Sequence, residues 1–127
     1  MIQIGTNLNV IDNCGAKKAY CIKIIQGFKK RYAFLGDIIL VAIKTIRKRR
    51  KMQSKVKKGE MYRALIVRTK TKNFYSYRDQ ISFFENSVVL INKQNKFLGT
   101  RVFGPIPNKL RYTKYMRLLF MSAGTLS

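Results

Sequence analysis

Short apolar runs, rich in β-branched residues, recur along the chain and are separated by segments rich in Gly, Asn and Asp. Five runs stand out: Leu8–Ile11, Ala19–Ile25, Ile38–Ile46, Ala64–Val67 and Val88–Ile91. Runs of this length between turn signals are typical of β-strands. A small five-stranded sheet hides its edges best by closing on itself. The pattern therefore predicts a mostly β fold built on a five-stranded β-barrel.

The apolar runs are too continuous for a sheet that faces water on one side, so we expect part of the outer surface to be covered. The pattern changes after Gly104–Pro107, where Leu110, Tyr115 and Leu118 recur with basic residues between them. This spacing predicts one or two short C-terminal α-helices. We expect a single domain over residues 1–127, with the barrel at about 1–103 and a small helical part at about 104–127.

The net charge of the chain indicates the class of partner that it binds. The 127 residues include 27 Lys and Arg but only 5 Asp and Glu, which gives a formal net charge of +22. A chain with this balance repels itself unless a polyanion neutralises it. There is no His, and the five acids are scattered, so the usual acid–base and metal-ligand groups are almost absent. We expect neither an enzyme nor a cofactor, and the glycines form no nucleotide-binding motif.

The two cysteines and the apolar runs restrict the setting further. Cys14 and Cys21 lack the spacing of a redox motif and the companions of a zinc site, so we expect two reduced thiols. The longest uninterrupted apolar run, Ile38–Ile43, is far shorter than the roughly 18 residues of a membrane span, and we expect no membrane partner.

Three basic strips are candidates for phosphate contact. The segment from Lys44 to Lys58 carries nine bases and no acid, and it predicts a long basic hairpin loop between the third and fourth strands. A solvated loop is the alternative, but a like-charge block of this length favours phosphates. The second strip is Arg68–Asn73, which leads into aromatic residues that either stack on bases or pack across strands. The third is Phe28–Tyr32, between the second and third strands.

Several blocks resemble one family in the same order along the chain. The N-terminal block runs from Leu8 through the Asp12–Gly15 turn to Ile39, and the later blocks are Lys55–Glu60, Ala64–Lys70 and Leu98–Pro105. Together they closely resemble the large-subunit ribosomal protein number fourteen family over essentially the whole chain. The resemblance implies a five-stranded barrel that binds large-subunit rRNA and neighbouring large-subunit ribosomal proteins. The alternative is a free single-stranded nucleic-acid-binding barrel protein.

The resemblance and the basic strips together give the candidate site residues. We expect rRNA to be bound by Lys17, Lys18, Lys29, Lys30, Arg31, Lys44, Arg47, Lys48, Arg49, Arg50, Lys51, Lys55, Lys57, Lys58, Arg68, Lys70 and Lys72. The resemblance also implies a surface that meets small-subunit rRNA at an intersubunit bridge and accepts a ribosome silencing factor. The matching positions are Thr100, Arg101, Lys114 and Arg117.

Two segments depart from the family pattern, and the composition of the chain bears on where the protein is located. The stretch Arg47–Ser54 is longer and more basic than the family's Gly-containing loop, and the hairpin Asp79–Gln80 stands where the family usually has Asp-Gly. Lys, Ile, Asn, Phe and Tyr are plentiful, as an AT-rich coding sequence produces, and we expect no targeting leader before the first family block. We therefore expect the ribosome of a mitochondrion, with a plastid or a bacterial cytoplasm as alternatives.

Overall fold

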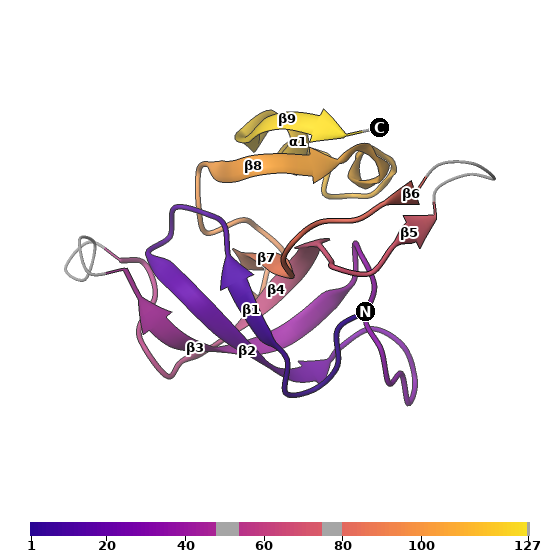
Figure 1. Ribbon diagram of the computed structural model, residues 1–127. Coiled ribbons are helices and arrows are strands. Elements are labelled where there is room, and N and C mark those ends of the chain that lie inside the picture. The colour runs from indigo at the N-terminus through magenta and orange to yellow at the C-terminus, as the bar shows by residue number, and fades with distance from the viewer. Residues whose placement is uncertain (48–53, 75–79, 127) are drawn as a thin grey trace.

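Five strands close into a barrel, as the apolar runs predicted. The computed structural model describes residues 1–47, 54–74 and 80–126. In their order around the barrel the strands are β1 (Asn7–Val10), β2 (Ala16–Ile24), β3 (Ile38–Ile46), β4 (Met61–Arg68) and β7 (Ser87–Ile91). Neighbouring strands are antiparallel except β1 and β7, which pair in parallel and close the barrel (Figure 1).

Successive side chains of a strand point to opposite faces, and here both faces of β3, β4 and β7 are apolar. Inside the barrel, Ile39, Ile66 and Leu90 belong to one buried cluster. Their neighbours in sequence, Leu65 and Val89, are also fully buried but belong to a second cluster, on the outside. The continuous apolar runs of the sequence thus correspond to strands that are buried on both sides.

The C-terminal segment supplies the outer cover that the sequence predicted. Its elements are β8 (Val102–Pro107), the 3-10 helix η2 (Asn108–Tyr112), α1 (Arg117–Met121) and β9 (Ser122–Leu126). Buried side chains of this segment complete the outer cluster, among them Ile106, Leu110, Tyr115 and Leu118. Figure 1 shows β8, α1 and β9 stacked on one side of the barrel.

The C-terminal part that was expected to contain short helices contains strands as well. The short helical segments are present, but β8 and β9 form a parallel two-stranded ribbon around them. Gly104 and Pro105 lie inside β8. Each strand of a two-stranded ribbon is an edge strand, and an edge tolerates a proline that lacks a backbone donor.

A second small ribbon projects from the barrel. It pairs β5 (Asn73–Phe74) with β6 (Gln80–Ile81), which confirms a hairpin here (Figure 1). Asp79 and the aromatic residues Tyr75 and Tyr77 lie outside the described residues, as does the stretch 48–53, whereas Gln80 belongs to β6. Among the helices of the described ranges, none is long and apolar enough to span a bilayer.

Candidate nucleic-acid interface

The direction of each strand determines at which of the two ends of the barrel its loops lie. The segments 11–15, 54–60 and 92–101, together with Arg47 at the end of β3, lie at what we call the first end. The segments 1–6, 25–37 and 69–72 lie at the second end. The predicted basic strips therefore divide between opposite ends of a rigid body.

Backbone hydrogen bonds assemble the first end around the turn at Gly15. The Arg47 amide donates to the Gly15 carbonyl at 2.9 Å, and the Lys55 amide donates to the Cys14 carbonyl at 3.0 Å. A Cβ at Gly15 would lie 2.5 Å from the Ser54 Cβ, so only glycine permits this approach. The Lys55 ammonium donates to the Leu98 carbonyl at 3.0 Å. The two borders of the predicted basic loop are thus fixed against the barrel.

Most of the predicted rRNA-binding bases at or near this end are exposed: Lys17, Lys18, Lys44, Lys55, Lys57 and Lys58. The Lys44 ammonium lies 4.8 Å from the centroid of the Tyr20 ring. Arg47 is only half-buried and donates to the Val10 carbonyl at 3.3 Å. Lys48, Arg49, Arg50 and Lys51 lie outside the described residues.

Asn13 connects this end to the segment that was predicted to meet the small subunit. Its Oδ1 accepts hydrogen bonds from the amides of Thr100 at 2.7 Å and Arg101 at 3.3 Å. Its Nδ2 donates to the Thr100 hydroxyl at 2.8 Å. The sequence around Asn13 indicates only a turn, because nothing local points to a partner 87 positions away. The structure therefore places Thr100 and Arg101 beside the first end.

The carboxylate of Asp12 anchors the same turn from inside. It is fully buried and accepts hydrogen bonds from the amides of Cys14 at 3.2 Å and Leu90 at 3.1 Å. Burial raises the pKa of this carboxyl, while the hydrogen bonds it accepts and the charge of Arg47 act in the opposite direction. The Asp12–Gly15 turn is thus held by β7 and in turn holds Thr100.

The second end carries its own exposed bases: Lys29, Arg31, Lys70 and Lys72. Lys30 is half-buried, and its ammonium pairs with Asp37 at 2.5 Å. The N-terminal amine donates to the Thr71 hydroxyl, and Ile2 pairs with Ala33, so the strips 29–31 and 70–72 are tied to the same N-terminal segment.

Arg68 differs from the other predicted rRNA-binding residues because its guanidinium faces protein. It donates to the carbonyls of Pro105 at 2.9 Å and Phe103, and to the Glu85 carboxylate at 3.2 Å. Its side chain is 11% exposed, and burial lowers its pKa from the usual arginine value. These contacts join β4 to β8, so Arg68 attaches the C-terminal cover to the barrel.

Acidic side chains neutralise few of these bases. Between described residues two ion pairs form, Lys30 with Asp37 and Arg68 with Glu85. Asp12 is buried, and Glu60 accepts a hydrogen bond from the Tyr62 hydroxyl. A net charge of +22 is therefore carried mostly on the surface, where it attracts polyanions.

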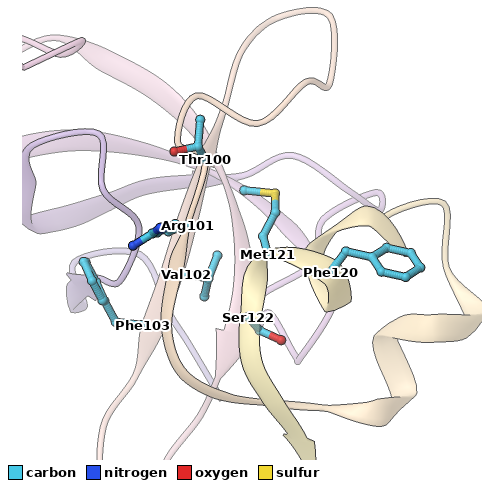
Figure 2. Close-up of a pocket in the computed structure, with 7 residues that line it drawn as sticks. All are labelled: Thr100, Arg101, Val102, Phe103, Phe120, Met121 and Ser122. Atoms are coloured by element: carbon cyan, nitrogen blue, oxygen red, sulfur yellow. The ribbon is translucent and has the colours of Figure 1, made fainter.

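Two of the four predicted intersubunit residues, Thr100 and Arg101, line a hollow of about 440 Å³ between β8 and the junction of α1 with β9. Thr100, Arg101, Val102 and Phe103 line one side, and Phe120, Met121 and Ser122 line the other (Figure 2). The Phe120 ring is 81% exposed and points away from β8 (Figure 2). Lys114 and Arg117 are exposed nearby in the chain but do not line the hollow.

The described residues offer little to covalent or metal chemistry. No group of three or more potential metal ligands occurs among them. Cys14 and Cys21 are buried free thiols. Burial, reinforced by the Asp12 charge, raises the pKa of the Cys14 thiol to about 12, so at neutral pH it is not a thiolate nucleophile.

Comparison with known families identifies the family of this chain. The family model described as "Ribosomal protein L14p/L23e" matches residues 1–126, nearly the whole chain. This extent includes the barrel, both of its basic ends and the C-terminal cover. The chain therefore belongs to the ribosomal protein L14p/L23e family, as a structural constituent of the large ribosomal subunit and not an enzyme.

Proposed function

We propose that the two basic ends of the barrel bind phosphates of large-subunit rRNA and so fix the protein within the subunit. The observation that carries this proposal is the surplus of exposed lysines and arginines at both ends, with two ion pairs between described residues. Phosphate contacts position a protein on RNA without reading sequence, which suits a rigid barrel with basic loops. Arg68 is outside this set, because its donors already serve Phe103, Pro105 and Glu85.

The salt dependence of rRNA binding tests the first end. Lys57 and Lys58 are exposed bases of the predicted Lys44–Lys58 segment. The logarithm of the binding constant falls as the logarithm of the salt concentration rises, and we expect the double change Lys57→Gln and Lys58→Gln to make this fall less steep. Two lost phosphate contacts correspond to a decrease of roughly 1.4 to 1.8 in the magnitude of the slope of log K against log salt concentration.

Lys93 and Lys96 provide the matched control. They are exposed at the same end but outside the predicted strips, and changing both to Gln removes the same charge. We expect the control to leave the slope nearly unchanged. Equal slopes for both double variants would show that binding responds only to net charge, and the proposed contacts would be wrong.

We further propose that the surface around the hollow faces the small subunit, where it contributes to a bridge with small-subunit rRNA and accepts a ribosome silencing factor. Arg101 is exposed at its edge, Asn13 holds the backbone of Thr100 and Arg101, and Lys114 and Arg117 add exposed positive charge. A partner with RNA phosphates or acidic side chains complements this surface.

Charge reversal separates this surface from the rRNA-binding ends. With Arg101→Glu and Arg117→Glu, we expect large subunits to assemble normally, while subunit joining and silencing-factor binding are weakened. If assembly fails while the surviving subunits join and bind the factor normally, these residues face large-subunit rRNA instead.

We propose a mitochondrial ribosome as the location, with an organellar gene. The support is the abundance of Lys, Ile, Asn, Phe and Tyr, which an AT-rich coding sequence produces. Mapping the gene tests this proposal: we expect mitochondrial DNA, and a nuclear, plastid or bacterial gene would contradict it.

A further inference from the structure

The Phe28 ring is almost fully in solvent. It is 92% exposed, in the loop that joins β2 to β3 at the second end, where the N-terminus also lies (Figure 1). Single exposed apolar residues are common on protein surfaces and by themselves indicate nothing. Phe28 differs because its loop is held in place and its neighbours in sequence are Lys29, Lys30 and Arg31.

Hydrogen bonds fix the loop where it leaves the barrel. Ile2 and Ala33 exchange two backbone hydrogen bonds, at 2.9 and 2.8 Å. The Asp37 carboxylate accepts from the Phe34 amide at 2.8 Å and from the Lys30 ammonium at 2.5 Å. A ring presented from a fixed loop loses less conformational entropy on binding than one on a free chain.

The turn itself brings positive charge against the ring. Gly27 has a φ of +95°, and Lys29 adopts a φ of +50°, which non-glycine residues seldom do. The Lys30 side chain packs 3.1 Å from where a Gly27 Cβ would lie, so the turn is closed on itself. The Lys29 ammonium lies 5.5 Å from the centroid of the Phe28 ring.

A ligand that suits this loop has a flat apolar face and negative charge beside it. Lys29 and Arg31 are exposed, whereas Lys30 is already paired with Asp37. An unpaired nucleotide offers both features, since its base has a π-face and its phosphates are anionic. An acidic protein segment offers the charge, but it does not require an aromatic ring.

We propose that Phe28 stacks on the base of an unpaired nucleotide in large-subunit rRNA, while Lys29 and Arg31 bind the adjacent phosphates. The proposal rests on the proposed rRNA-binding function and adds to it a base contact at a defined side chain. It also distinguishes the two ends of the barrel, because the first end then binds phosphates and the second end also binds a base.

The chain contains no tryptophan, so Phe28→Trp introduces a single indole reporter at this position. We expect protein-free large-subunit rRNA to quench its fluorescence, because the indole stacks on a base. Phe120→Trp is the control, since Phe120 is 81% exposed on α1, away from the proposed large-subunit contacts. Quenching of both indoles to the same extent, or of neither, would overturn the proposal.

An affinity series separates stacking from apolar packing. We expect Phe28→Ala and Phe28→Leu each to weaken rRNA binding by about 5- to 100-fold, and Phe28→Tyr to retain it. The salt slope should stay that of the unchanged chain, because no phosphate contact is removed. If Phe28→Leu binds like the unchanged chain, the ring packs as an apolar group and the proposal is wrong.

The same measurements distinguish failure of this inference from failure of the proposed function. Normal rRNA binding and salt slope, with an unquenched Phe28→Trp indole, would overturn the stacking contact alone. No binding of rRNA by the unchanged chain would overturn both. If rRNA alone does not quench the fluorescence of the Phe28→Trp indole but added ribosomal proteins do, the partner is a protein and the proposal is contradicted.

Discussion

The Arg47 guanidinium lies 5.0 Å from the centroid of the Phe103 ring, and this contact joins the border of the basic loop to β8. Arg47 follows the last residue of β3, whereas Phe103 lies in the strand that continues from the proposed intersubunit segment. The Phe103 amide also donates to the Ile11 carbonyl at 2.8 Å, in the same turn region that holds Arg47. The proposed rRNA-binding and intersubunit surfaces therefore share one packed junction.

A double-mutant cycle measures this junction. Arg47→Gln and Phe103→Leu remove the cation and the ring in turn, and we expect a coupling energy of about 0.5 to 1 kcal/mol from denaturant unfolding. The expected size is modest because Phe103 is 45% exposed. Strictly additive effects of the two changes would show that the contact contributes nothing to stability.

Gly104 is expected to be among the positions least tolerant of a side chain. Its φ is +81°, and a Cβ would collide with the Arg68 guanidinium, 3.0 Å from its central carbon. Gly104→Ala combines left-handed strain with displacement of Arg68 from the carbonyls of Phe103 and Pro105. We expect a loss of about 3 kcal/mol or more in the free energy of unfolding.

Gly59 tests whether the loss expected at Gly104 comes from backbone strain alone or also from the displacement of Arg68. It has nearly the same φ, +86°, but a Cβ there would meet nothing within 4 Å. Gly59→Ala should therefore cost only the backbone strain, about 1 to 2 kcal/mol. Similar losses for the two variants in urea unfolding would contradict the role assigned to Arg68.

The Cys14 thiol gives the fold a dependence on alkaline pH. Burial raises its pKa from 9.0 to about 12, so the folded protein retains this proton at pH values where the unfolded chain releases it. The resulting stabilisation is complete below pH 9 and is lost as the pH rises toward 12. Relative to Cys14→Ser, the unchanged chain should lose about 2 kcal/mol between pH 8 and about pH 10.5.

Unfolding of both proteins at the two pH values checks this expectation, and the comparison removes the contribution of every other group that titrates in this range. A difference between the two proteins that does not change with pH would mean that Cys14 ionises equally in both states.

Self-repulsion should make the isolated protein sensitive to salt. The net charge of +22 opposes compaction, and added salt screens exposed charges beyond about 10 Å at 0.1 M. We expect the thermal midpoint to rise with ionic strength, and to rise less for the Lys57→Gln and Lys58→Gln variant. A midpoint that is indifferent to salt would refute this reasoning.

Local sequence patterns were sufficient to predict the barrel strands. The runs Ala64–Val67 of β4 and Val88–Ile91 of β7 are buried on both faces, so the run itself is the signal, whereas β1 and β2 alternate buried with more exposed residues. The spacing of Leu110, Tyr115 and Leu118 likewise predicts the helical segments of the C-terminal cover. These patterns could not predict β8, because Gly104 and Pro105 are turn residues in most contexts and lie in a strand here through the pairing of β8 with β9.

The interface residues likewise divide into those that local sequence patterns predict and those whose role depends on distant contacts. Exposed bases such as Lys57 and Lys29 follow from charge runs, because long like-charge segments cannot be buried. Arg68 appeared to be one more base of its strip, and its burial depends on carbonyls 35 and 37 positions away. The hydrogen bonds of Asn13 to Thr100 also depend on contacts between distant parts of the chain, which no local pattern encodes.

The most direct test of the central claim is sedimentation of the chain with large ribosomal subunits in a high-salt gradient. A structural constituent that binds rRNA at both ends of its barrel should co-migrate with the large subunit at one copy per particle and should resist the salt wash. A chain that is stripped by high salt and sediments free of the subunit, as a free single-stranded nucleic-acid binder would, contradicts this account.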